Sequence, residues 1–204
     1  MKQERAIVWF RNDLRTKDHE PLLEACRNYE EIIPLYIYDQ RFWKESRAAK
    51  ISRFSGHRFQ FLKGCLEDLR ESLRELGGDL VIRNGQPEDI IPALCEEHKV
   101  SKVFFHEEVP SEEVNIETAL IQNLKKEGRS HQSFWNCTLA HHDDIPFEDI
   151  NWLPDVFTEF RKKTEKNCEW RNPLPAAESI KIPDEVRAGE IMTFEEGGFP
   201  KPPS

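Results

Sequence analysis

The chain of 204 residues lacks the patterns that most readily identify a known chemistry. It contains no GxGxxG and no GxxxxGK[ST], so neither the dinucleotide fingerprint nor the phosphate-cradling loop is available. It contains no GxSxG either, which leaves covalent catalysis from a nucleophile elbow without support. The five cysteines are widely spaced and form no CxxC, so neither a disulfide framework nor a zinc ribbon is indicated.

Long apolar runs and an excess of positive charge are missing as well. No apolar stretch approaches the roughly 20 residues of a membrane span, and the first residues lack the apolar core of a signal peptide. We therefore expect a soluble, cytoplasmic protein with reduced thiols and no membrane partner. The net charge of −9 argues against a nucleic-acid-binding surface in this part of the protein, because phosphate contacts need clustered Lys and Arg.

What is present is a regular alternation of strand and helix patterns. Short apolar runs rich in β-branched and aromatic residues predict five strands, at residues 6–10, 32–38, 79–83, 101–105 and 132–137. Apolar side chains at helical spacing lie between them, the longest such stretch running from about Ser52 to Leu76. This alternation predicts an α/β fold, a doubly wound parallel five-stranded sheet with helices on both faces. It does not give the strand order.

Two local features carry more specific expectations. Asp18 or Thr16 can cap the first helix, whose Pro21 stands where an early helical turn tolerates proline. Pro34 argues that the second apolar run begins a strand there or contains a bulge.

The pattern changes near residue 140, where prolines begin to interrupt every periodicity. A single helical piece remains, around Val156 to Asn167. We therefore divide the chain into an α/β domain at 1–140 and an extended, proline-rich connector at 141–204. The connector is expected to leave the sheet domain toward a further domain.

Acidic residues gather where the fourth predicted strand ends. Glu107 and Glu108 follow that strand, and Glu112 with Glu113 open the next helix. One explanation of such a cluster needs no ligand: acidic side chains at the start of a helix are solvated and are stabilised by the helix dipole. The functional alternative is a carboxylate that accepts hydrogen bonds from a heterocycle such as a pterin.

A second cluster contains metal-ligand residue types. It runs from His141 through His142 and Asp143 to Asp144, with Cys137 upstream. Neither helical nor i, i+2 spacing makes these donors converge, so we predict no metal site.

Several segments resemble one family. The segment Trp9 to Arg15, WFRNDLR, resembles the opening signature of the DNA photolyase and cryptochrome flavoproteins. The segments 58–62 and 78–88 resemble a helix–strand block of the DASH cryptochromes, and Leu153 to Lys162 is similar to their LPDVFTxFRK element. The resemblance covers roughly residues 6–165. In that family, this portion is the N-terminal α/β antenna domain.

The resemblance implies a site for the antenna chromophore 5,10-methenyltetrahydrofolate. Glu113 falls at the family's pterin-binding glutamate, with Glu112 beside it, while Asp39 and Arg41 flank the antenna pocket. Glu117, one helical turn beyond Glu113, is expected to lie outside the site. The resemblance assigns FAD and the DNA cleft to a helical domain that follows in the family. That domain is the expected partner, and the present 204 residues are expected to be inactive alone.

For the parent protein, the resemblance implies blue-light-driven, FAD-dependent repair of cyclobutane pyrimidine dimers, preferentially in single-stranded DNA. One alternative is a blue-light photoreceptor cryptochrome without repair activity. Another is a stand-alone nucleotide-binding or protein-interaction domain of similar fold.

Overall fold

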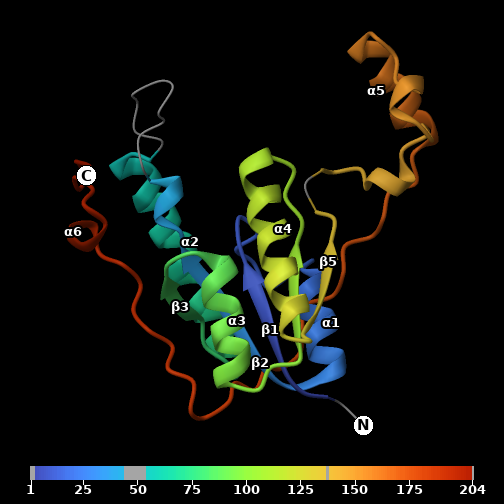
Figure 1. Cartoon of the computed structure of the whole chain (residues 1–204). Helices are drawn as coiled ribbons and strands as arrows, with labels where there is room; N and C mark the ends of the chain where they lie inside the picture. The colour runs from blue at the N-terminus through green and yellow to red at the C-terminus, as the bar shows by residue number, and fades with distance from the viewer. Residues whose placement is uncertain (1–2, 44–53, 137, 204) are drawn as a thin grey trace.

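The structure, a computed structural model, describes residues 3–43, 54–136 and 138–203. Its centre is a parallel sheet of five strands in the order β3-β2-β1-β4-β5 (Figure 1). The strands are β1 (Gln3–Phe10), β2 (Tyr29–Tyr38), β3 (Val81–Asn84), β4 (Lys102–His106) and β5 (Ser130–Phe134). The predicted five-stranded doubly wound fold is confirmed, and the strand order places the reversal of winding between β1 and β4.

Helices cover both faces of the sheet, because the strands are apolar on both sides. Ala6, Val8 and Phe10 of β1 pack toward one face, and Ile7 with Trp9 pack toward the other. The first face is covered by α1 (Glu20–Asn28) and α2 (Gly56–Glu75), and the second by α3 (Pro87–Glu97) and α4 (Ser111–Lys126).

The cap of α1 differs from the expectation. His19, rather than Thr16 or Asp18, is the N-cap residue, and its ring Nδ1 accepts the Leu22 backbone N–H at 3.1 Å. An imidazole replaces the usual short oxygen side chain because His19 is also held from its other side, by Asp13.

Pro34 lies inside a continuous strand, so the expectation of a strand start or a bulge is wrong. β2 begins at Tyr29, and Pro34 pairs with Val8 of β1. The Ile32 N–H points to the opposite edge, where it bonds Lys181 O, and period-two alternation directs the Pro34 nitrogen to the same edge. β3 pairs with β2 only from Leu35 onward. The donor that proline lacks is therefore not needed.

The C-terminal part contains more helix than predicted. α5 (Phe157–Asn167) matches the expected helical piece, but α6 (Phe194–Gly197) and the 3-10 turns η2 (His142–Asp144) and η3 (Ile150–Trp152) were not expected. α6 is stabilised by a capping box between Thr193 and Glu196. No helix in the described ranges is long and apolar enough to cross a membrane.

Residues 174–200, here called the strap, return along the β3 side of the sheet. The Ile82 N–H donates to Ala188 O at 2.6 Å, and the Ile180 N–H donates to Leu76 O at 2.7 Å. Ala177, Ile180 and Met192 are buried in the core. The expectation that the connector leaves the sheet domain is therefore wrong for the strap. It occupies backbone groups of an edge strand that would otherwise be unpaired. The division at residue 140 stays a prediction.

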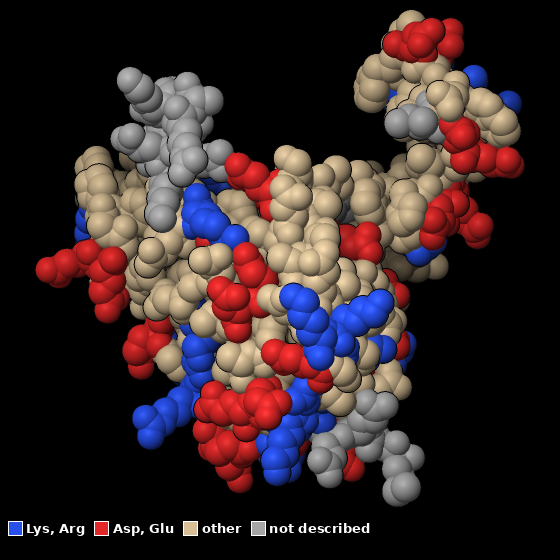
Figure 2. All heavy atoms as spheres, in the orientation of Figure 1, with Lys and Arg blue, Asp and Glu red and all other residues tan. Residues whose placement is uncertain are grey.

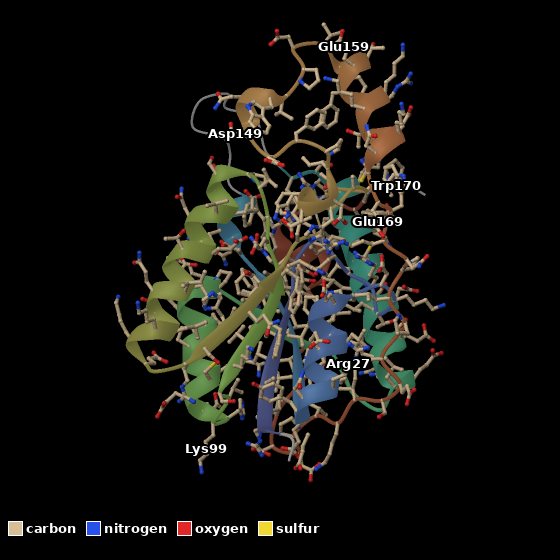
Figure 3. The ribbon with its side chains drawn as sticks, turned by 90° about the vertical axis from the view of Figure 1, so that its right-hand side faces the viewer. Arg27, Lys99, Asp149, Glu159, Glu169 and Trp170 are labelled. Carbon is tan, nitrogen blue, oxygen red and sulfur yellow. The ribbon has the colours of Figure 1, made fainter. Side chains whose placement is uncertain are left out.

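Residues 138–171, here called the arm, project from the same end of the molecule as the carboxyl ends of the strands (Figure 1). In the side view, Asp149 and Glu159 lie far beyond that edge, while Glu169 and Trp170 lie nearer the sheet (Figure 3). Six large apolar side chains of the arm are exposed: Leu139, Trp152, Leu153, Val156, Phe157 and Trp170.

Candidate functional site: a cavity at the carboxyl edge of the sheet

A cavity of about 610 Å³ opens where β1 and β2 end. In doubly wound sheets this edge, near the reversal of strand order, is where ligands bind. The walls come from the loop after β1, the turn after β2, the first half of α2 and the start of α4. The lining residues used below are Trp9, Arg11, Asp13, Tyr36, Asp39, Trp43, Phe54, Phe61, Glu112 and Glu113.

Aromatic side chains form much of the cavity wall. Trp43 packs against Phe54 and Tyr38, with ring centroids 6.2 Å and 5.4 Å apart. Burial raises the pKa of Tyr36, so its phenol stays neutral in the wall. Phe61, at the mouth, is 74 % exposed. Such a cavity suits a flat, largely apolar ring system.

Three of the four predicted site residues line this cavity: Glu112, Glu113 and Asp39. Arg41 does not line it. Its guanidinium instead donates to the Asp39 carboxylate at 2.5 Å and to the Glu88 carboxylate at 2.7 Å. These hydrogen bonds, the one to Asp39 most strongly, raise the pKa of Arg41. Asp39 also accepts the Arg41 backbone N–H at 2.9 Å. The carboxylate of Asp39 is therefore already paired, and through Arg41 it links the end of β2 to Glu88 of α3.

Glu113 differs from its acidic neighbours in that its carboxylate has no described hydrogen-bond or ion-pair partner. Its side chain is half-buried at the first turn of α4, and within the described part of the chain no hydrogen bond or ion pair engages it. Glu108, by contrast, accepts a hydrogen bond from Asn12 at 2.8 Å, and burial raises its pKa. The helix dipole favours the charge of Glu113 while leaving both oxygens available to a ligand.

Glu117 does not line the cavity, as expected, but it supports the cavity wall through Arg11, which does. Its buried carboxylate forms an ion pair with Arg11 and accepts the Glu108 backbone N–H at 2.9 Å. Arg11 also donates to the carbonyl of His106 at 3.2 Å and lies 4.5 Å from the Trp9 ring centre. The signal was present in the sequence, because Glu117 shares helical spacing with the inward-facing Leu120 and Leu124.

A second buried cluster fixes the loop after β1. The Asp13 carboxylate meets His19 Nε2 at 2.8 Å and His106 Nδ1 at 2.5 Å, and accepts the Arg11 backbone N–H at 2.7 Å. Because His19 Nδ1 accepts from Leu22, its proton is on Nε2 and is donated to Asp13. Burial alone would raise the Asp13 pKa, but hydrogen bonds from His106 and His19 outweigh it and hold the pKa well below its ordinary value. Burial lowers the His19 pKa.

The polar donors of the second predicted cluster do converge, contrary to expectation. One ligand atom each from His141, His142 and Asp143 lies within 4.8 Å of the other two. The spacing argument fails because a 3-10 turn, rather than a helix or strand, carries them. Cys137 lies outside the described residues.

The fold is that of a doubly wound α/β domain, with a cavity at the carboxyl edge of its sheet. The family model for DNA photolyase matches residues 6–179, and the chain belongs to that family. It is 39% identical over 202 residues to Cryptochrome DASH of Gloeobacter violaceus, covering 99% of this chain and 40% of that protein. It is 38% identical to the chloroplastic/mitochondrial Cryptochrome DASH of Arabidopsis thaliana, covering 94% of this chain and 34% of that protein.

Solved structures agree with these sequence relationships. The crystal structure of a Synechocystis cryptochrome matches 98% of this chain with a TM-score of 0.88 at 32% identity, and 41% of that chain is covered. A bacterial class III photolyase from Agrobacterium tumefaciens matches 93% of this chain and 37% of its own, with a TM-score of 0.78 at 27% identity. The chain thus spans about 40% of these relatives' length and corresponds to the N-terminal domain of the DASH cryptochromes.

Proposed function

We propose that this chain is the light-harvesting domain of a DASH-type cryptochrome or photolyase and that the cavity holds a folate antenna. The observation that carries the proposal is the carboxylate of Glu113, which lines a cavity with aromatic walls and which no described residue engages. Every other acidic group considered above is either engaged by a described partner or more exposed to solvent. A pterin ring needs an apolar slot and an acceptor for its adjacent ring N–H and amino groups, and this cavity offers both.

The residues present fit 5,10-methenyltetrahydrofolate. The volume of about 610 Å³ lies within the range of small-molecule sites. Glu113 would accept hydrogen bonds from the pterin, and the rings of Trp43 and Phe54 would exclude water from its faces. Glu112, exposed at the same helix start, would stay at the rim. Asp39 and Arg41 would contribute rigidity, because their charges are already paired with each other.

When bound, the folate would absorb near-ultraviolet and blue light and pass the energy to a reduced FAD in the parent protein. The chain's own part is to hold the chromophore in a fixed orientation. Two buried polar contacts would hold the wall of the cavity in place. The ion pair between Arg11 and Glu117 joins the loop after β1 to α4, and the hydrogen bond between Asp13 and His106 joins the same loop to β4. Both therefore fix the cavity wall beside Glu113.

The partner that we propose is the helical FAD-binding domain of the same parent chain. The exposed apolar side chains of the arm support this proposal, because the surfaces of soluble proteins seldom carry so many large apolar side chains in one segment. Trp152, Val156 and Phe157 are 62%, 56% and 73% exposed within six residues. A domain seated over the carboxyl edge would cover both the arm and the mouth of the cavity. The arm lies at the end of the molecule where the strands end (Figure 1), and the cavity is lined by the residues at those strand ends.

In the parent, we propose blue-light-driven repair of cyclobutane pyrimidine dimers, preferentially in single-stranded DNA, with the DNA held by the FAD-binding domain. The net charge of −9 supports placing DNA elsewhere. On the face shown in Figure 2, acidic and basic side chains are interspersed, without a continuous basic track. A photoreceptor without repair activity is distinguished by exposing the flavin-containing parent and dimer-bearing DNA to blue light: undiminished dimers would favour signalling.

The antenna site is tested with Glu113→Gln in the flavin-containing parent. The substitution keeps the size but turns one acceptor into a donor that faces the ligand's own donors. A charge-assisted hydrogen bond contributes about 1.5 to 3 kcal/mol, so folate affinity should fall at least tenfold while FAD content stays normal. Near-ultraviolet folate absorbance of the purified protein, relative to flavin absorbance, measures the effect.

Glu127→Gln is the matched control. Glu127 is exposed just beyond the other end of α4, about 20 Å along the helix from Glu113. It should leave folate occupancy unchanged. Glu117→Gln is unsuitable, because it would leave the buried Arg11 without its anionic partner. Full folate occupancy in the Glu113 variant would show that this carboxylate is only a helix-start charge.

A further inference from the structure

The turn that begins the arm gathers three metal-ligand side chains outside the cavity. His142 Nε2 lies 2.9 Å from Asp143 Oδ1, and His141 Nδ1 lies 3.6 Å from Asp143 Oδ2. The two imidazole rings are nearly parallel, with centroids 4.6 Å apart. Two nitrogens and a carboxylate oxygen are thus presented on one side of a single turn.

Neighbouring contacts hold this turn in place. The Asp144 carboxylate accepts hydrogen bonds from Arg171 Nε at 2.5 Å and Arg171 Nη2 at 2.8 Å, which ties the turn to the far end of the arm. The ring of Trp135 packs edge-on against His142, with centroids 4.7 Å apart. The donors are therefore positioned before any ion arrives, which lowers the entropic cost of binding one.

The spacing of the donors is close to that of a common coordination geometry. Bonds of about 2.0 to 2.1 Å to zinc place neighbouring tetrahedral ligands about 3.3 Å apart. The two histidine nitrogens lie 2.9 Å and 3.6 Å from different oxygens of the Asp143 carboxylate, and one ligand atom of each residue lies within 4.8 Å of the other two. Imidazole nitrogen with one carboxylate is a donor set that suits zinc and other late first-row divalent ions better than magnesium or calcium.

The competing interpretation is a simple polar turn. His141 Nδ1 already accepts the Asp143 backbone N–H, but at 3.2 Å this hydrogen bond is long and inexpensive to replace. Asp143 is more than half exposed, so its carboxylate can rotate toward an ion without unburying anything else.

We propose that His141, His142 and Asp143 bind one zinc-type divalent cation, with further coordination positions left to water. The site joins the exit of β5 to the base of the arm, so a bound ion would stiffen the point from which the arm projects. The inference is independent of the antenna cavity, since none of its three residues lines that cavity.

The test uses the 204-residue chain, stripped with a chelator and titrated with Zn²⁺ by isothermal calorimetry. We expect one ion per chain with a dissociation constant of about 10 µM or tighter. His142→Asn and Asp143→Asn should each weaken binding at least tenfold. His57→Asn removes an exposed histidine from α2 and should change nothing. Circular dichroism checks that the variants fold.

A second readout locates the ion. Cu²⁺ quenches nearby indole fluorescence, so its addition should quench Trp135, and Trp135→Phe should abolish that part of the quenching. Co²⁺ should give the intense visible bands of a four- or five-coordinate ion. Zinc binding that is absent, or that survives both His142→Asn and Asp143→Asn undiminished, would overturn the proposal.

Discussion

Gly189→Ala is the change that most directly tests how the strap holds the sheet. Gly189 has a φ of +77°, and a Cβ built there would lie 2.7 Å from the carbonyl oxygen of Ile82. The left-handed conformation costs an L-residue about 1 to 2 kcal/mol. Relief of the overlap would need the strap to move by about 0.7 Å, away from β3. That movement weakens the bond from Ile82 N–H to Ala188 O, now 2.6 Å long, which contributes about 1 kcal/mol.

The total is about 2 to 3 kcal/mol of unfolding free energy, or roughly a 30- to 150-fold change in the folded-to-unfolded ratio. Urea unfolding of the 204-residue chain measures it, and thermal unfolding should show a fall of about 5 to 10 °C. Amide exchange at Ile82 should accelerate more than exchange in β1, because the strap loosens first.

Two other glycines separate the possible causes. Gly198 has a φ of +69° with open space around it, so Gly198→Ala should cost only the conformational term, about 1 kcal/mol. Gly64 is inside α2 with nothing near its Cβ position, so Gly64→Ala should stabilise by about 0.5 to 1 kcal/mol. If Gly189→Ala costs no more than Gly198→Ala, the contact between strap and β3 does not stabilise the protein and the reasoning is refuted.

The other predictions concern acid stability and DNA. Because folding lowers the Asp13 pKa, its contribution to stability is present above the unfolded-state value near 3.8 and is lost as pH falls below it. Asp13→Asn should therefore destabilise the chain at pH 7 by about 1.5 kcal/mol or more, and urea unfolding at pH 3 should show a smaller difference; an equal difference at both pH values would contradict this. The 204-residue chain should bind labelled single-stranded DNA only weakly at physiological salt, where the screening length is about 8 Å and the charge of −9 opposes phosphate. Binding at micromolar concentration or tighter would contradict that expectation.

Much of the fold could be predicted because it depends on local patterns. The apolar run at residues 6–10 indicated a strand buried on both faces, and its alternate side chains do pack into separate cores. α3 begins at Pro87, a residue type that favours the first position of a helix. The strap could not be predicted in the same way. Its stabilisation comes from contacts such as Ile82 N–H with Ala188 O, more than 100 residues apart, and prolines in its sequence indicate only the absence of regular structure.

For the candidate site as well, local position could be predicted from the sequence, whereas contacts between distant residues could not. Position along α4 was enough to place Glu113 and Glu112 on the cavity, because the carboxyl edge of a parallel sheet collects the starts of the following helices. It was not enough to distinguish Glu113, which no described residue engages, from the carboxylates that already have partners. Asp39 and Glu117 are as acidic as Glu113 in sequence, and only the distance to Arg41 or Arg11 shows that their charges are already used.

That distinction bears on how an acidic sheet edge could hold the proposed folate chromophore. An acidic edge with unpaired charges would repel a chromophore with an anionic tail and would attract cations instead. Here Arg11 and Arg41 neutralise the carboxylates that build the wall, and both histidines beside Asp13 point their ring nitrogens at its carboxylate. Among the described acidic residues that line the cavity, Glu113 remains as a half-buried acceptor without a described partner, so we expect recognition of the proposed chromophore to depend on its carboxylate. Substitutions of the paired residues should therefore affect folding and antenna binding together, whereas Glu113→Gln should affect binding alone.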